Sequence, residues 1–205
     1  MIEKIKKIRE ITKFSLGECK RALEKAGGSI DDALILLQGV QTDRHINRLG
    51  KIASEGIITS YVHTGSQVAC IVEINCETDL AARSESFILF CEDIAMHVAA
   101  MQPMYISKDE VSEDQEEAQK RVILDRLAEH HEGKSEEYIA DNLKSNLRNW
   151  YREAILMEQT SVTNQSKTIT DLLEALSTQL GEKVQISRFE RWSVGALVPT
   201  DSGTN

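Results

Sequence analysis

The chain has 205 residues, a formal net charge of −9, and a composition with 41% hydrophobic and 28% charged residues. This length suits one or two domains that can bury a core without disulfide or metal staples. The acidic balance argues against a nucleic-acid-binding protein, which normally has a net basic domain, and no run approaches the roughly 18 apolar residues of a membrane span.

Residues 1–39 are predicted to form a three-helix module. Isoleucines recur every three residues in the first helix, which indicates an apolar stripe; they are Ile2, Ile5, Ile8 and Ile11. Gly27-Gly28 is typical of a left-handed helix stop, and Ser29 followed by Asp32 resembles the capping box that starts a third helix. The module resembles the ubiquitin-associated (UBA) type of bundle, a common docking module.

Charge is distributed unevenly along the chain. Residues 1–25 carry eight Lys or Arg against four Asp or Glu, whereas residues 109–137 carry eleven acidic against four basic residues. A small basic module suits an acidic protein surface, and a solvated charged helix face is the alternative interpretation.

The rest of the chain is predicted to be a small antiparallel sheet covered by helices, which makes the fold class α+β. After a polar connecting helix or linker at 40–55, a hairpin turns at Thr64-Gly65-Ser66, and its second strand is central because it is apolar on both faces. The strands are expected at 57–63, 67–75 and 182–194, and the helices at 82–101, 113–132, 135–157 and 169–180. The second and third of these helices fold back as an antiparallel hairpin. The core domain is placed at 56–195, with a flexible tail at 196–205.

The sequence offers no active site of its own. No phosphate-cradling glycine motif is present, so no cofactor is expected. The cysteines and histidines lack zinc spacing, so no metal is expected, and free thiols in a reducing cytosol are predicted. His97 is interpreted as a core histidine. The cysteines are Cys19, Cys70, Cys76 and Cys91.

One short stretch remains open at this level. In "VEINCETDLAAR" a buried strand runs into the acidic turn Glu77-Thr78-Asp79 and then into Leu80. Thr78 or Asp79 would cap the following helix with an apolar residue turning inward. Metal binding and insertion into a partner are the two alternatives.

Several motifs in series resemble one family. "LGECKRALEKAGGSIDDAL", "ASEGII", "VEINCETD", "DIAMHVAAM", "EGKSEEYI" and "LMEQ" follow one another over residues 2–195. In this order and at these distances they are similar to the short bacterial type of the elongation factor Ts family, which has one copy of the core sheet. The resemblance implies a cytoplasmic protein that is not an enzyme but a guanine-nucleotide exchange factor for the GTPase elongation factor Tu.

The resemblance also implies which residues contact the partner. Thr78, Asp79 and Leu80 correspond to the family's Thr-Asp-Phe element, which enters the GTPase near its magnesium ion, with Leu80 in place of Phe. Lys20 corresponds to a basic residue of the N-terminal module. His63 matches a sheet position, and Val162 matches an apolar loop position.

The remaining expectations concern partners. Position 80 separates an exchange factor from a divergent relative that holds elongation factor Tu without releasing its nucleotide, or from a UBA-like adaptor. Short family members can pair through their core sheets, so a homodimer is possible. Direct nucleic-acid binding and membrane binding are not expected.

Overall fold

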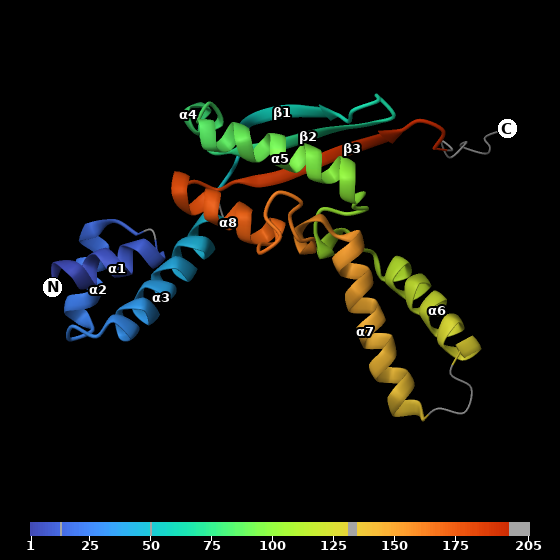
Figure 1. Cartoon of the computed structure of the whole chain (residues 1–205), viewed down its shortest axis with the longest axis horizontal. Helices are drawn as coiled ribbons and strands as arrows, with labels where there is room; N and C mark the ends of the chain where they lie inside the picture. Colours follow the sequence, from blue (N-terminus) through green and yellow to red (C-terminus); the bar gives the residue numbers. More distant parts are fainter. Residues whose placement is uncertain (13, 50, 131–134, 197–205) are drawn as a thin grey trace. The chain divides into compact units, whose positions relative to one another are not determined.

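The computed structural model describes residues 1–12, 14–49, 51–130 and 135–196. It confirms the α+β class, with helices and one three-stranded antiparallel sheet (Figure 1). The chain divides into two compact units, Met1–Lys51 and Ile52–Asn205.

The first unit contains α1 (Ile2–Thr12), α2 (Leu16–Lys25) and α3 (Ile30–Leu49). Ser15 caps α2 in a capping box with Glu18, and the Asp32 N–H donates to the Ser29 hydroxyl at the start of α3. The glycines between α2 and α3 have φ values of 59° and 86°, as the predicted left-handed stop requires. The buried core is Ile5, Ile8, Phe14, Cys19, Ala22, Leu23, Ala33 and Leu37.

Two details of this unit correct the prediction. Ile2 and Ile11 are 71% and 57% exposed, because each three-residue step falls about 60° short of a full turn and the three steps from Ile2 to Ile11 add up to about half a turn around the helix. The third helix does not end at residue 39. It continues to Leu49, so the first part of the segment predicted as a connecting helix or linker at 40–55 is helical but is not separate from the third helix, and no proline interrupts it.

The second unit is built on a sheet with the strand order β1-β2-β3. These strands are β1 (Glu55–Val62), β2 (Val68–Cys76) and β3 (Gln185–Ser193). The hairpin pairs Glu55 with Cys76 and Val62 with Ala69, and β3 adds to the other edge of β2 with a bulge between Glu73 and Ile74. The prediction that β2 is central is confirmed.

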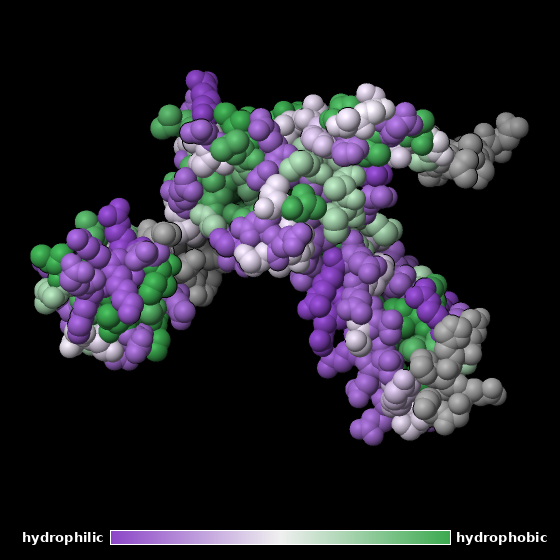
Figure 2. Space-filling view, in the orientation of Figure 1, coloured by the Kyte–Doolittle hydropathy of each residue, from purple (hydrophilic) through white to green (hydrophobic). Residues whose placement is uncertain are grey.

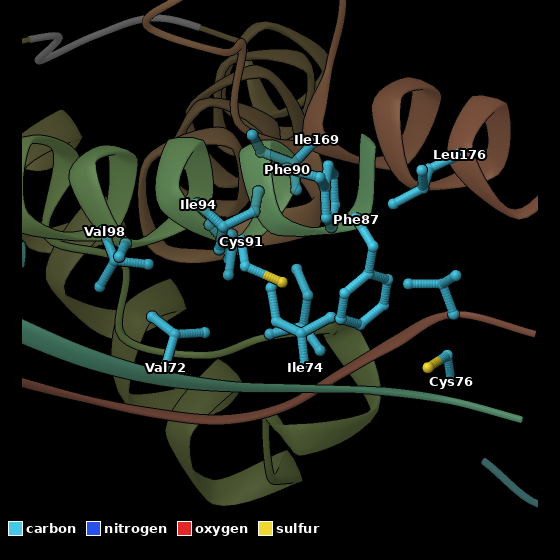
Figure 3. Close-up of a cluster of buried hydrophobic side chains, with 14 of the residues drawn as sticks. Val72, Ile74, Cys76, Phe87, Phe90, Cys91, Ile94, Val98, Ile169 and Leu176 are labelled. Carbon is cyan, nitrogen blue, oxygen red and sulfur yellow. The ribbon is translucent and has the colours of Figure 1, made fainter. Parts of the chain in front are cut away.

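Helices α5 (Glu85–Met101) and α8 (Ile169–Leu180) contribute most of the helical part of the core, against the inner face of the sheet (Figure 3). Phe87, Ile94 and Val98 of α5 are fully or almost fully buried. The strands contribute Val72, Ile74 and Cys76, and α8 contributes Ile169 and Leu176. This packing fixes the last residues of β2 and the first residues of β3, and the candidate site lies beside them.

The predicted sheet covered by helices is confirmed, and in the part of the chain that the structure describes the helices cover one of its two faces. On the outer face Ile58 is 65% exposed and Trp192 is 58% exposed, and Val62 and Ile71 also lie exposed. An apolar residue on both faces of β2 therefore identified a central strand correctly, but did not establish that both faces are buried.

The hairpin of α6 (Glu113–His130) and α7 (Glu136–Ala154) forms an arm (Figure 1), and its predicted connection lies mostly outside the described residues. The Tyr151 hydroxyl donates to the Glu116 carboxylate at 2.5 Å, and Lys120 pairs with that carboxylate at 2.9 Å. These contacts lower the pKa of Glu116, while burial and the neighbouring carboxylate raise that of Tyr151 to about 12. The arm is thus held near its base by polar contacts.

All four cysteines are free and buried. Burial raises the pKa of Cys70 to about 11 and that of Cys91 to about 12. Because thiols react as thiolates, these side chains behave as small core residues.

Candidate partner-binding site

The candidate site begins where β2 leaves the sheet. The chain turns at residues 77–78 into α4 (Asp79–Ala82), a single helical turn. Thr78 is its N-cap, with extended backbone angles, and its hydroxyl accepts the Ala81 N–H at 3.2 Å. A second cap, Ser84, starts α5 two residues after α4 ends. The single helix predicted from residue 82 is therefore preceded by a separate turn.

The turn is attached to a distant part of the chain, at the connection between α8 and β3. The Glu182 carboxylate accepts the N–H groups of Glu77 and Thr78 at 3.1 and 3.0 Å, and the Thr78 hydroxyl at 2.7 Å. In the reverse direction, the Lys183 N–H donates to the Glu77 carboxylate at 2.6 Å. The carboxylates of Glu77 and Glu182 therefore both link the turn at residues 77–78 to the connection between α8 and β3.

The side chains of the short helix point two ways. Ala81 and Ala82 are buried against the core, whereas Leu80 is 79% exposed. Asp79 is also exposed and pairs with Arg83 at 3.3 Å. Figure 2 shows hydrophobic surface beside strongly hydrophilic surface at α4. The cap interpretation is thus right for Thr78 and wrong in expecting Leu80 to turn inward.

This arrangement presents an apolar side chain beside a carboxylate on an anchored backbone. Burying one leucine in a partner contributes roughly 1.5–3 kcal/mol. An exposed ion pair such as Asp79–Arg83 contributes about 1 kcal/mol or less, so Asp79 can exchange Arg83 for another cation at little cost. The turn is suited to insertion into a partner.

The other predicted residues lie elsewhere. His63 follows β1 at the hairpin, where its Nδ1 lies 3.0 Å from the Tyr61 hydroxyl. The strand register puts it at the opposite end of the sheet from Leu80, about 25 Å away at roughly 3.4 Å per residue. Lys20 belongs to the first unit, where it is exposed and 3.8 Å from Glu24. Within the second unit His63 and Leu80 do not share one pocket, so only a large partner could contact both of them.

Val162 is half-buried in the loop before α8, and a buried histidine holds its backbone. The Val162 N–H donates to Nδ1 of His97 at 3.3 Å. Nε2 of His97 in turn lies 2.8 Å from Oε1 of Gln159, whose amide nitrogen donates to the Glu153 carbonyl. The interpretation of His97 as a core histidine is confirmed, and its neutral form is the one that fits these partners.

Acid is expected to weaken this loop contact. Burial lowers the pKa of His97 below its ordinary value of 6.5. As the pH falls, the unfolded chain therefore binds a proton at this residue before the folded chain does. The stabilising effect is complete above about pH 6.5 and is lost as the pH falls through the folded pKa. Urea unfolding at about pH 7.5 and 5.5 should show a larger loss of stability in the wild type than in His97→Gln, which keeps an amide donor and acceptor but does not titrate. Equal losses in both proteins would contradict this assignment.

Local patterns could not have revealed two residues of the site. Glu182 lies 104 residues from Thr78 in the sequence, and Gln159 lies 62 residues from His97. Only the pairing of β2 with β3 and the packing of α5 bring these groups together.

Across the residues with described positions, no group of three or more His, Cys, Asp or Glu is placed to hold a metal ion. The described helices likewise include none long and apolar enough to cross a membrane.

Comparison with known proteins agrees with this organisation. The model of the family described as "Elongation factor TS" matches residues 4–196. Elongation factor Ts of Acetivibrio thermocellus is 37% identical over 94% of this chain and 89% of its own length. The corresponding protein of Syntrophobacter fumaroxidans is 35% identical over 94% and 95%, and that of Coprothermobacter proteolyticus is 36% identical over 93% and 96%. The chain belongs to the elongation factor Ts family of translation elongation factors.

Proposed function

We propose that this protein is a guanine-nucleotide exchange factor that acts on elongation factor Tu in the cytoplasm, and that it catalyses no bond-making reaction. Its Asp79–Leu80 turn enters the GTPase near the magnesium ion and promotes release of GDP. The observation that carries the proposal is an apolar Leu80, 79% exposed beside a carboxylate, on a turn whose backbone is anchored by Glu182. Membership of the family supplies the partner.

Burial of Leu80 supplies part of the free energy that faster nucleotide release requires, and Asp79 must contribute to the rest. A thousandfold faster release requires a barrier lower by about 4 kcal/mol. The factor obtains this only from contacts that are better in the nucleotide-loosened state than in the tight state. Burial of Leu80 contributes roughly 1.5–3 kcal/mol of such contact, and the carboxylate of Asp79 adds an electrostatic term close to the magnesium ion.

The second candidate is a stable partner that binds elongation factor Tu without releasing its nucleotide. The smaller leucine in place of the family's phenylalanine favours this alternative. Gel filtration of the complex formed from elongation factor Tu and labelled GDP separates the two. Exchange predicts a protein complex that elutes free of label, because linkage makes nucleotide and factor weaken each other's binding. Label that co-elutes in stoichiometric amount supports the stable partner instead.

Lys20 is proposed to help docking and not to trigger release. It is an exposed cation on a net basic stretch, and charges of this kind act mainly on association rate and salt dependence. Lys20→Ala should therefore slow complex formation by about threefold at low salt and less at physiological salt, with an unchanged melting temperature. Stopped-flow association at two salt concentrations measures the effect. Identical rates would remove Lys20 from the docking surface.

We also propose that a second copy of the chain covers the outer face of the sheet. Ile58 and Ile71 flank a hollow of about 240 Å³ on this face, and Glu73 pairs there with Arg188. Because the face carries both signs of charge, a twofold-related copy can set each charge against its opposite. Sedimentation should show a dimer that Ile58→Glu dissociates and that Ile52→Glu, at an 83% exposed position outside the sheet, leaves intact. A wild-type monomer at about 100 μM would contradict this proposal.

A further inference from the structure

The short helix that carries Leu80 has little packing of its own. Four residues are too few for a helix to be stable by itself, and α4 buries only the two small side chains Ala81 and Ala82. Its Thr78 cap satisfies one N–H group. A turn of this kind needs an external anchor if it is to present Leu80 in one orientation.

Glu182 supplies that anchor. One carboxylate oxygen accepts two consecutive backbone N–H groups, from Glu77 and Thr78, and the other accepts the Thr78 hydroxyl. Hydrogen bonds to an ionised carboxylate are about twice as strong as neutral ones. The three bonds fix both the backbone and the capping side chain, so they determine the direction in which α4 leaves the strand.

The anchor is itself held in place. Gly181 ends α8 in a left-handed conformation with φ 73°, so the chain turns sharply just before Glu182. The next residue, Lys183, donates its N–H to the Glu77 carboxylate, and β3 begins at Gln185. Glu182 is therefore fixed by a helix end on one side and by a sheet strand on the other.

We infer that Glu182 is a positioning residue for the Asp79–Leu80 turn, and that through the turn it sets the rate of nucleotide release. The inference rests on the proposed exchange function. Glu182 acts through the backbone of residues 77 and 78 and need not touch the partner. A turn that is already ordered loses little conformational entropy when it binds. A mobile turn loses conformational entropy each time it binds, and this cost reduces the free energy gained from its contacts.

The test combines Glu182→Ala, Glu182→Gln and the control Glu174→Ala, which removes the same charge from the middle of α8. Amide hydrogen exchange is measured on the free protein, and labelled-GDP release is measured at saturating factor. Glu182→Ala should speed exchange of the Glu77 and Thr78 amides about tenfold while the Val72 and Ile74 amides keep their protection. It should lower the maximal release rate by about tenfold without a matching change in the half-saturating concentration.

Glu182→Gln keeps the side-chain length and one carbonyl acceptor, so it should lie between the wild type and Glu182→Ala in both measurements. It also keeps the test decisive if the alanine variant does not fold. Glu174→Ala should match the wild type in both measurements.

Two results would overturn the inference. Unchanged exchange of the Glu77 and Thr78 amides would show that Glu182 does not anchor the turn. Faster amide exchange with an unchanged release rate would show that anchoring has no part in release. Leu80→Ala in the same assay distinguishes failure of this inference from failure of the proposed function. If Leu80→Ala retains the full rate of GDP release, the proposed role of the turn is wrong, whatever the amide exchange of Glu77 and Thr78 shows.

Discussion

Leu80→Ala is expected to reduce GDP release from elongation factor Tu by about ten- to a hundredfold while the melting temperature of the free protein stays the same. The side chain is 79% exposed, and exposed substitutions change stability by only about half a kcal/mol. The same side chain contributes roughly 1.5–3 kcal/mol when a partner buries it. Leu80→Phe restores the larger apolar tip and should speed release above that of the wild type.

A matched control for this prediction is Ala81→Gly on the same turn. Ala81 is buried, so this variant should lower the melting temperature, because it removes a buried methyl group and loosens the backbone. If Leu80→Ala instead melted earlier and kept its release rate per folded molecule, Leu80 would be a structural residue.

Gly56→Ala is expected to destabilise the sheet strongly. Gly56 has a φ of +151° and pairs with Asn75 in the β1–β2 ladder. An added Cβ would lie 2.2 Å from the carbonyl oxygen of Ile74 and 2.7 Å from the Cα of Asn75. Both neighbours are backbone atoms of the central strand and cannot move aside, so the variant should lose about 3 kcal/mol or more.

Tryptophan fluorescence during thermal unfolding measures this loss, because Trp150 and Trp192 both lie in the second unit. The midpoint should fall by roughly 10 °C. Gly39→Ala is the control: it lies in α3 with no atom within 4 Å of the new Cβ, and it should leave this transition unchanged. A Gly56→Ala midpoint within about 2 °C of the wild type would contradict the close approach.

Periodic patterns predicted most of the fold. Alternation identified the hairpin and the central strand, helix periodicity identified α8, and periodicity with a glycine stop identified α2, because these signals depend on neighbours in the sequence. The outward direction of Leu80 was not predictable in this way. A capped helix start with an apolar residue at its second position fits either direction, and the buried Ala81 and Ala82 decide it.

The anchoring of the turn is also beyond local patterns. Glu182 reaches Thr78 only because β3 pairs with β2 and leaves the α8–β3 connection beside the strand end. The exposure of the outer face of the sheet was not predictable from local patterns either. Apolar residues on both faces of a strand indicate that it has a neighbouring strand on each side, but they do not indicate which elements cover it. Both features depend on the tertiary arrangement.

The rate of labelled-GDP dissociation from elongation factor Tu, measured with and without saturating wild-type protein, tests the central claim most directly. Release should be faster by about a thousandfold, which corresponds to about 4 kcal/mol of barrier, and Leu80→Ala should remove ten- to a hundredfold of that gain. A dissociation rate that the bound wild-type protein leaves unchanged would contradict exchange activity and favour the stable partner.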